Sequence, residues 1–199
     1  LGEPSEIAPP SPRSREQIPA LPGKSVRLCK QKCYPPSERK NHKMRNFGED
    51  LRLLLEIADQ IDRYTLEHFT QRDYQVYEKA DLTPVSDIDR GAEQMIRQAL
   101  AAARPDDLIY GEEYGGNAAE ATQARWIIDP IDGTKNFVRG VPVWATLIGL
   151  ELAGEMVASV VSAPALARRW WAGRGLGSWR SFQGGQPQAK IGRASCRER

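Results

Sequence analysis

Apolar residues recur at helical spacing in two segments of the chain. In residues 49–69 they fall three or four positions apart, as on one face of an amphipathic helix, and they are Leu51, Leu54, Leu55, Ala58, Ile61 and Phe69. Residues 87–103 repeat this spacing, and Ser86 or Asp87 has a side chain suited to cap the start of a helix. Pro105 prevents the second helix from continuing. The pattern therefore predicts two long helices, at residues 49–69 and 87–103.

Short apolar runs elsewhere predict strands. These runs are residues 75–77, 108–110, 126–128, 144–152, 155–163, 168–172 and 178–182. The run at 126–128 has no alternation of apolar and polar residues, which predicts a strand that is buried on both faces. Gly154 lies between the two longest runs and predicts a turn joining an antiparallel pair. Residues 136–140 are expected to form a turn or a short helix. The fold class predicted is α+β, with helices stacked on a mainly antiparallel sheet.

The two ends of the 199-residue chain differ in composition from its middle. Residues 1–47 hold eight of the 14 prolines and carry ten Lys or Arg against four Asp or Glu, without helical or strand periodicity. This composition is typical of a disordered basic leader. We interpret it as translated upstream sequence with the native start at Met44, and a genuine basic arm is the alternative. Residues 191–199 lack apolar periodicity and are expected to be a non-native tail. Residues 48–190 are therefore predicted to be the folded part.

The charge and cysteine content of that part exclude several classes of protein. The whole chain has a net charge of +2, but residues 48–190 carry 15 basic and 21 acidic side chains. Because nucleic-acid-binding domains present a basic patch, no nucleic-acid partner is expected. The cysteines, at positions 29, 33 and 196, all lie in the two ends, so neither a disulfide framework nor a Cys-based zinc site is expected. The apolar stretch 141–150 is too short to span a bilayer, which predicts a soluble cytoplasmic protein without a membrane partner.

Two carboxylates follow one of the predicted strands. Residues 126–137 read Trp-Ile-Ile-Asp-Pro-Ile-Asp-Gly-Thr-Lys-Asn-Phe, so Asp129 and Asp132 come directly after the apolar run, with a stiff proline between them. Oxygen ligands of this kind suit Mg²⁺. The amides of Gly133 and Thr134 would face an anion at the start of a helix. Asp-Pro and Asp-Gly pairs are also ordinary turn formers, so a simple turn is the alternative for this segment alone.

Two other segments carry acidic residues at the ends of predicted elements. Glu112 and Glu113 follow the run at 108–110, and Asp89 lies in the first turn of the second helix, ten residues after Lys79. A pair of glutamates in a loop is normally solvated, and an acid in the first turn of a helix commonly complements the helix dipole. Each segment therefore has a structural explanation when it is considered alone.

Together and in this order, the three segments resemble the inositol monophosphatase family of Mg²⁺-dependent, lithium-sensitive phosphatases. The resemblance covers about residues 50–182. It implies the layered α-β-α-β-α sugar-phosphatase fold, of which this chain would form the N-terminal part. Within the family, residues 134–146 and 162–172 look most like the histidinol-phosphatase branch of actinobacterial type.

The resemblance implies ligands for two to three Mg²⁺ ions. Glu112, Asp129 and the backbone carbonyl of Ile131 resemble ligands of a first ion. Asp129 and Asp132 resemble ligands of a second ion, with Asp129 as the bridging carboxylate. Glu112 would also reach a third, loosely held ion.

The resemblance also implies catalytic roles. Thr134 and Asp89 look like the pair that orients and deprotonates the attacking water, whose pKa the ions would lower. Lys79 would support the acidic cluster by offsetting the repulsion among its carboxylates. The ester phosphate would lie on the metal ions and on the amides of Gly133 and Thr134.

The implied activity is hydrolysis of a small phosphorylated metabolite. Histidinol phosphate, an intermediate of histidine biosynthesis, is the favoured substrate and inositol monophosphate is the alternative. The family takes a further aspartate ligand from a Trp-Asp-type motif in its second half, and no such motif follows Phe182. We therefore expect this chain to be a truncated fragment that is inactive by itself. The competing hypothesis is a non-catalytic metal- or phosphate-binding fragment. A complete enzyme is expected to form a homodimer.

Overall fold

The structure of the chain is a computed structural model that describes residues 45–80, 82–116 and 123–189. The expectations for the basic leader up to residue 44, for a start at Met44 and for a tail at residues 191–199 lie outside the described residues. In the described part, no helix combines the length and apolarity needed to cross a membrane.

Two long helices form where the apolar spacing predicts them. Helix α1 spans Phe47–Gln71, and the side chain of Asn46 caps it by accepting the backbone N–H of Gly48 at 3.0 Å. Helix α2 spans Asp87–Ala103, the range predicted from the sequence. The prediction of two long helices is therefore confirmed, and α1 is longer than expected by two residues at each end.

Seven strands form one sheet in the order β3-β4-β5-β6-β7-β8-β9. These are β3 (Leu108–Gly111), β4 (Arg125–Asp132), β5 (Ala145–Leu152), β6 (Glu155–Ala163), β7 (Arg168–Gly173), β8 (Gly177–Phe182) and β9 (Gln188–Ala189). Among the described strands of this sheet, only β3 and β4 pair in parallel, and all other neighbours are antiparallel, so the sheet is mainly antiparallel, as predicted.

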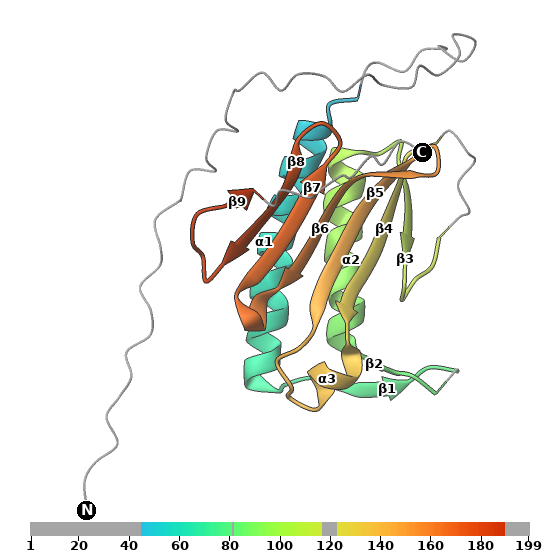
Figure 1. The fold of residues 1–199 in the computed structure, drawn as a ribbon. Helices are drawn as coiled ribbons and strands as arrows, with labels where there is room; N and C mark the ends of the chain where they lie inside the picture. The colour runs from blue at the N-terminus through green and yellow to red at the C-terminus, as the bar shows by residue number, and fades with distance from the viewer. Residues whose placement is uncertain (1–44, 81, 117–122, 190–199) are drawn as a thin grey trace, which may run out of the picture. The chain divides into compact units, whose positions relative to one another are not determined.

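The smaller elements lie near the ends of the larger ones (Figure 1). Strands β1 (Val76–Glu78) and β2 (Pro84–Ser86) form a separate antiparallel pair directly before α2. Helix α3 (Thr134–Val138) follows β4, and a 3₁₀ turn at Pro164–Leu166 joins β6 to β7. Pro84 stands at the first position of β2, where a missing N–H is tolerated.

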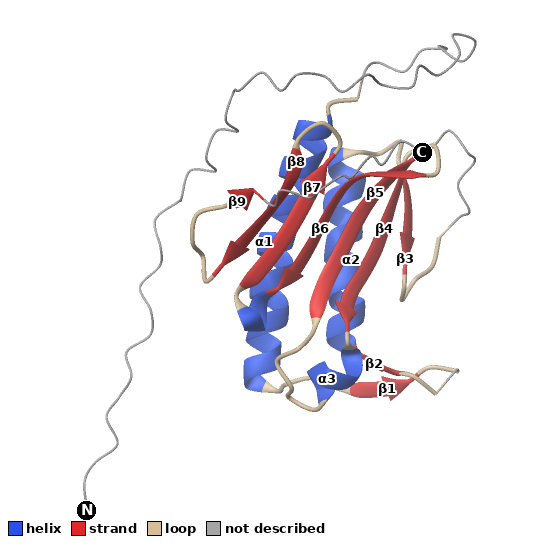
Figure 2. Cartoon of the chain, in the orientation of Figure 1, coloured by secondary structure: helices blue, strands red, loops and turns tan. Residues whose placement is uncertain are grey.

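Helices α1 and α2 both lie on the same face of the large sheet (Figure 2). Where they meet it, buried apolar side chains form the main core, which includes Leu54, Ile57, Ile61, Ile96, Leu100, Trp126, Ile128, Ile148 and Leu150. A second cluster consists of Ile88, Ile131, Phe137 and Trp144. Because Ile131 and Phe137 flank Asp132–Thr134, this second cluster supports the segment that carries the candidate site.

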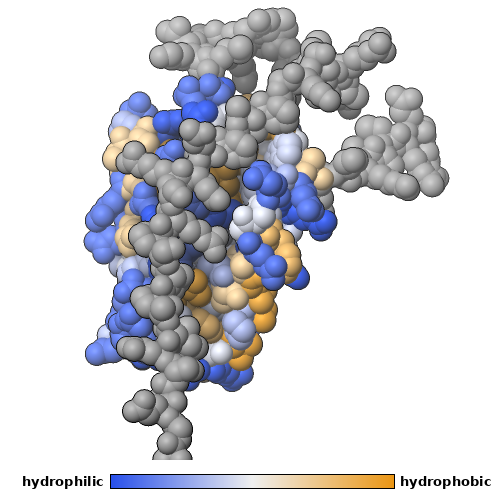
Figure 3. Space-filling view, turned by 90° about the vertical axis from the view of Figure 1, so that its left-hand side faces the viewer, coloured by the Kyte–Doolittle hydropathy of each residue, from blue (hydrophilic) through white to orange (hydrophobic). Residues whose placement is uncertain are grey.

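The other face of the sheet is not covered by any described element, which corrects one prediction. Burial alternates along β4, so that Trp126 and Ile128 are buried whereas Ile127 is only half-buried. The expected burial on both faces is therefore wrong for the described residues, because both long helices pack on one side. On the open face, Leu147 and Trp170 are also half-buried. Figure 3 shows a patch of apolar residues at the lower right of the space-filling view.

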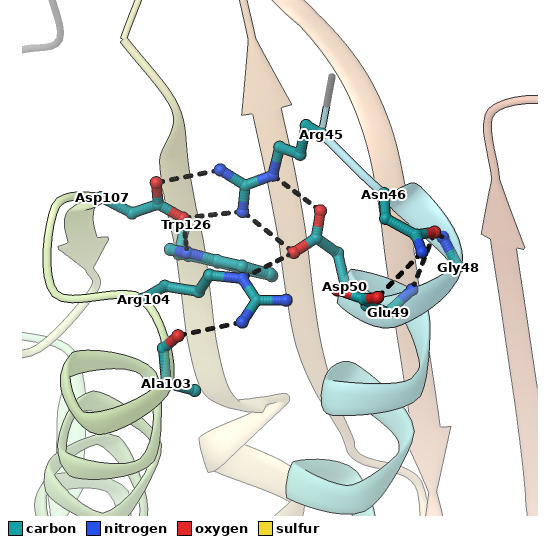
Figure 4. A network of polar contacts seen from close by, with 9 residues as sticks. All are labelled: Arg45, Asn46, Gly48, Glu49, Asp50, Ala103, Arg104, Asp107 and Trp126. Carbon is teal, nitrogen blue, oxygen red and sulfur yellow. Dashed lines mark hydrogen bonds and ion pairs between the residues drawn. The ribbon is translucent and has the colours of Figure 1, made fainter. Parts of the chain in front are cut away.

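A polar network ties the start of α1 to the end of α2 and to β4 (Figure 4). Asp50 is fully buried and accepts from Arg45 Nε at 2.6 Å and from Arg104 Nε at 2.9 Å. Arg45 also reaches Asp107, whose Oδ2 accepts the indole N–H of Trp126 at 2.8 Å. The two arginines compensate the buried charge of Asp50, so the network stabilises the contact between the helices.

Candidate active site

Four elements bring the predicted site residues to one end of the sheet. The parallel pairing of β3 with β4 places Gly111 beside Ile128, and the N–H of Glu112 donates to the carbonyl of Ile128 at 3.0 Å. Glu112 therefore begins a loop next to the segment of β4 that contains Asp129. The start of α2 contributes Asp89, and α3 begins directly after β4.

A break in strand pairing gives the two aspartates a common direction. Asp129 pairs with Leu147 and Asp132 pairs with Ala145, so β4 has one residue more than β5 between these pairs. In a regular strand, residues three positions apart point to opposite faces. A bulge that adds one residue reverses this relation and redirects a side chain. Both carboxylates therefore lie on the open face of the sheet.

Asp89 and Thr134, which were predicted to act as a pair, are in contact. Asp89 is fully buried, and its Oδ2 accepts the N–H of Ser86 at 2.8 Å and also the Ser86 hydroxyl. The hydroxyl of Thr134 is 3.1 Å from Asp89 Oδ1 and 3.0 Å from the carbonyl oxygen of Ile131. Burial raises the pKa of the Asp89 carboxyl. From the sequence, Asp89 was expected to have either a helix-dipole role or a catalytic role. The structure adds a third role, because Asp89 and Ser86 form a capping box at the start of α2.

Lys79 lies among the carboxylates that it was predicted to support. Its Nζ donates to Glu112 Oε1 at 2.9 Å and to Glu113 Oε1 at 2.7 Å. Although burial alone would lower the pKa of Lys79, the bonds to Glu113 and Glu112 raise it. A cavity of about 430 Å³ opens beside it and is lined by Lys79, Thr83, Pro84, Glu112, Gly133, Thr134 and Lys135.

Gly133 occupies a conformation that a side chain would strain. Its φ is +96°, and a Cβ at this position would approach the carbonyl oxygen of Val143 to 3.2 Å. The chain therefore turns sharply after Asp132, and α3 starts at Thr134 beside the cavity.

The electrostatics of Asp129 fit a cation. Its Oδ1 is buried and has no hydrogen-bond partner among the described residues. The pKa of Asp129 is raised to about 8, most strongly by burial and also by the neighbouring Glu112, Asp132 and Asp89. A divalent cation would neutralise this repulsion and supply the missing partner. In the described ranges, no three His, Cys, Asp or Glu side chains are close enough to enclose an ion.

The metal-free protein is expected to become less stable as the pH rises from about 4 to about 8. The folded state keeps a proton on Asp129 up to a pKa of about 8, whereas the unfolded chain releases it near 3.8. Between these values the unfolded state binds fewer protons, so the free energy of unfolding falls with rising pH. Because the group is partly open to solvent, we expect a loss of roughly 1–3 kcal/mol. Urea unfolding in EDTA at several pH values measures it.

The variant Asp129→Asn is the control for this pH dependence. It cannot titrate, so most of the fall in stability between these pH values should disappear. Asp89 and Glu113 contribute the remainder, because burial raises the pKa of both carboxyls as well. Parallel stability profiles for the wild type and the variant would show that Asp129 is not the titrating group.

The fold matches solved structures of two bacterial proteins. The extragenic suppressor protein suhB from Bartonella henselae superposes with a TM-score of 0.62 at 33% identity, over 68% of this chain and 52% of that chain. The IMPase of Thermotoga maritima superposes with a TM-score of 0.61 at 32% identity, over 69% of this chain and 52% of that chain. The described part is therefore an inositol monophosphatase-like α+β fold, as the resemblance implied.

The sequence leads to the same family. The model of the inositol monophosphatase family matches residues 49–193. This chain belongs to the inositol monophosphatase family. It is 52% identical over 139 residues to the histidinol-phosphatase of Mycobacterium tuberculosis, covering 70% of this chain and 53% of that protein. It is 53% identical over 133 residues to the histidinol-phosphatase of Streptomyces coelicolor, covering 65% of this chain and 49% of that protein. The chain thus spans about half the length of these relatives.

Proposed function

We propose that this chain supplies the metal- and phosphate-binding part of a Mg²⁺-dependent phosphomonoesterase. The observation that carries the proposal is the environment of Asp129, a partly buried carboxylate with a pKa raised to about 8, whose Oδ1 is buried and has no hydrogen-bond partner among the described residues. Glu112 and Asp132 are its neighbours, and Ile131 offers a backbone carbonyl beside them. These oxygen donors are the kind that Mg²⁺ prefers.

Bound Mg²⁺ ions would supply positive charge to the phosphate and lower the pKa of a coordinated water. The chain's own residues would orient and accept the proton of the attacking water. The Thr134 hydroxyl has one proton, so it donates either to Asp89 or to the carbonyl of Ile131. Donation to Asp89 leaves the Ile131 carbonyl free for a cation and leaves a lone pair of Thr134 free for water. Asp89 then receives the proton of the water through the Thr134 hydroxyl.

The phosphate of the substrate would occupy the cavity beside α3. The amides of Gly133 and Thr134 are the donors proposed for it, because anions are stabilised at the start of a helix. Lys79 and Lys135 line the same cavity and add positive charge near the phosphate.

Histidinol phosphate is the substrate we propose, because the two histidinol-phosphatases compared above share more than half of the aligned residues with this chain. The enzyme would then act in histidine biosynthesis. Inositol monophosphate is the second candidate, supported by the solved IMPase of the same fold. A cytoplasmic homodimer is part of the same proposal.

A non-catalytic metal- or phosphate-binding chain is the competing function. The chain spans about half the length of each relative, and its own residues would then bind a cation or a phosphate without turnover.

A phosphate-release assay separates the two functions. The 199-residue chain and a fusion of it to the second half of the Mycobacterium tuberculosis histidinol-phosphatase would be given histidinol phosphate or inositol 1-phosphate. We expect the fusion to release phosphate from histidinol phosphate in the presence of Mg²⁺, and this release should stop when EDTA is added. Binding of Mn²⁺ by a folded fusion that releases no phosphate from either compound would support the non-catalytic function instead.

A further inference from the structure

A buried carboxylate on α2 lies directly behind the loop that carries Glu112 and Glu113. Glu93 is fully buried and stands one helical turn after Asp89. Its Oε2 accepts the backbone N–H of Glu113 at 2.7 Å, and its Oε1 accepts that of Tyr114 at 3.3 Å. Hydrogen bonds from amides to a carboxylate are stronger than those to a carbonyl. The backbone of the loop is therefore held by a side chain from another element.

Gly111 shows how closely Glu93 approaches this loop. A Cβ at Gly111 would lie 1.9 Å from Glu93 Oε1, nearer than any real contact between such atoms. The missing side chain therefore makes room for the carboxylate to reach the two amides further along. Gly111 and Glu93 are therefore in close contact, although they are 18 positions apart in the sequence.

Arg97 holds the same turn from its outer side. Its Nε donates to Glu93 Oε1 at 2.7 Å, and its guanidinium also donates to the carbonyl of Gly115. Gly115 is paired with Gly111 through hydrogen bonds of 2.9 and 3.0 Å. Both ends of residues 111–115 are thus tied to α2, and Arg97 compensates the buried charge of Glu93.

Packing alone does not account for a carboxylate at position 93. Ala92 and Ile96, which neighbour it on the buried side of α2, are fully buried and apolar. An apolar residue at position 93 would pack in this environment without the cost of removing a carboxylate from water. This cost is compensated by the hydrogen bonds that Glu93 accepts from the two loop amides and by its ion pair with Arg97.

We propose that Glu93 is the positioning residue of the metal-binding loop. By fixing the amides of Glu113 and Tyr114, it sets the direction in which the side chain of Glu112 leaves the backbone toward Asp129. The proposal rests on the proposed function, because it takes Glu112 and Asp129 to be metal ligands. Loss of a residue that orients a metal ligand typically weakens metal binding by about 10- to 100-fold.

Calorimetric titration of the 199-residue chain with Mn²⁺ and backbone amide hydrogen exchange test the proposal. Glu93→Gln keeps the size of the side chain but presents an NH₂ group to one of the two amides. We expect the dissociation constant for Mn²⁺ to rise by about 10- to 100-fold, and the amides of Glu113 and Tyr114 to exchange faster. Unchanged affinity together with unchanged exchange at these two amides would overturn the proposal.

Asp50→Asn is the matched control for Glu93→Gln. Asp50 is also a fully buried carboxylate paired with arginine, but its partner Arg104 lies 11 residues beyond Glu93, about 16 Å along α2. This variant should lose stability while its affinity for Mn²⁺ stays within about twofold of the wild type, because it touches no part of the loop. An equal loss of affinity in both variants would mean that Glu93 acts only through general stability.

A second pair of variants keeps the test valid if Glu93→Gln does not fold. Arg97→Gln and Arg104→Gln remove similar, mostly buried arginines, with side chains 25% and 28% exposed, from the two buried carboxylates. Of these two variants, we expect only Arg97→Gln to weaken Mn²⁺ binding and to speed hydrogen exchange at the backbone amide of Glu113. Both effects should be smaller than those of Glu93→Gln. If the wild type binds no Mn²⁺, the metal-dependent function is what fails. The exchange rates then still decide whether Glu93 holds the loop.

Discussion

Asp129→Asn is expected to weaken Mn²⁺ binding by more than about 100-fold, because loss of a group that only orients a ligand already costs about 10- to 100-fold. Phosphate release by the fusion enzyme should fall to background. The same variant should stabilise the metal-free protein near neutral pH, because Asp129, with its pKa raised to about 8, must take up a proton on folding, whereas an amide at this position takes up none. Calorimetric titration, a phosphate assay and urea unfolding in EDTA measure the three effects.

The opposite signs of these effects distinguish a metal ligand from a residue of the scaffold. A scaffold residue would lose binding and stability together, whereas a ligand should lose binding while the metal-free fold becomes more stable. Asp106→Asn makes the same chemical change at an exposed turn before β3 and should alter neither quantity. Retention of Mn²⁺ affinity in a folded Asp129→Asn protein would remove the basis of the proposed function.

Trp126→Ala is expected to reduce the free energy of unfolding by about 3–5 kcal/mol, as for other large aromatic residues in cores. Trp126 is fully buried between the sheet and the two long helices. Its indole N–H donates to Asp107, and the guanidinium of Arg45 lies 5.6 Å from its ring centre. Truncation therefore creates a cavity and also leaves a polar partner unpaired. Against a total stability of about 5–15 kcal/mol for a typical domain, this loss is large.

Urea unfolding followed by circular dichroism measures the loss, with Trp170→Ala as control. Trp170 is half-buried on the uncovered face of the sheet, so its truncation should cost less than about 1 kcal/mol. Equal losses in the two variants would show that the uncovered face contributes as much to the core as the face under the helices.

Local patterns were sufficient to predict most of the elements. Helix α2 and strand β6 have the bounds predicted from the sequence, because strong periodicity and clear end signals coincide in both. Strand β4 was predicted only over residues 126–128, where the apolar run lies. It extends to Asp132, because β5 pairs with it on both sides of the bulge. Pairing of this kind depends on a distant segment and leaves no mark in the local pattern.

The chemistry of the candidate site could be predicted, but the residue that supports its loop could not. The motif around Asp129 stands out in the sequence, whereas the pairing of Asp89 with Thr134 was implied only by the resemblance to the family. Glu93 was missed because a glutamate four residues before an arginine is typical of a solvated ion pair. A signal was present, since Glu93 falls within the apolar stripe of α2, between Ala92 and Ile96. A charge on the buried face of a predicted helix is therefore a useful indication of a buried polar partner.

The extra residue of β4 makes the site sensitive to length as well as to residue type. Adding one residue to β5 between Ala145 and Leu147 would restore regular pairing with β4 and turn Asp132 toward the helices. The two acids would then lie on opposite sides of the sheet, although both were still present in the sequence. Replacement of Pro130 leaves the number of residues unchanged and so preserves their common direction. A one-codon insertion in β5 is thus a more damaging genetic change than a missense change at Pro130.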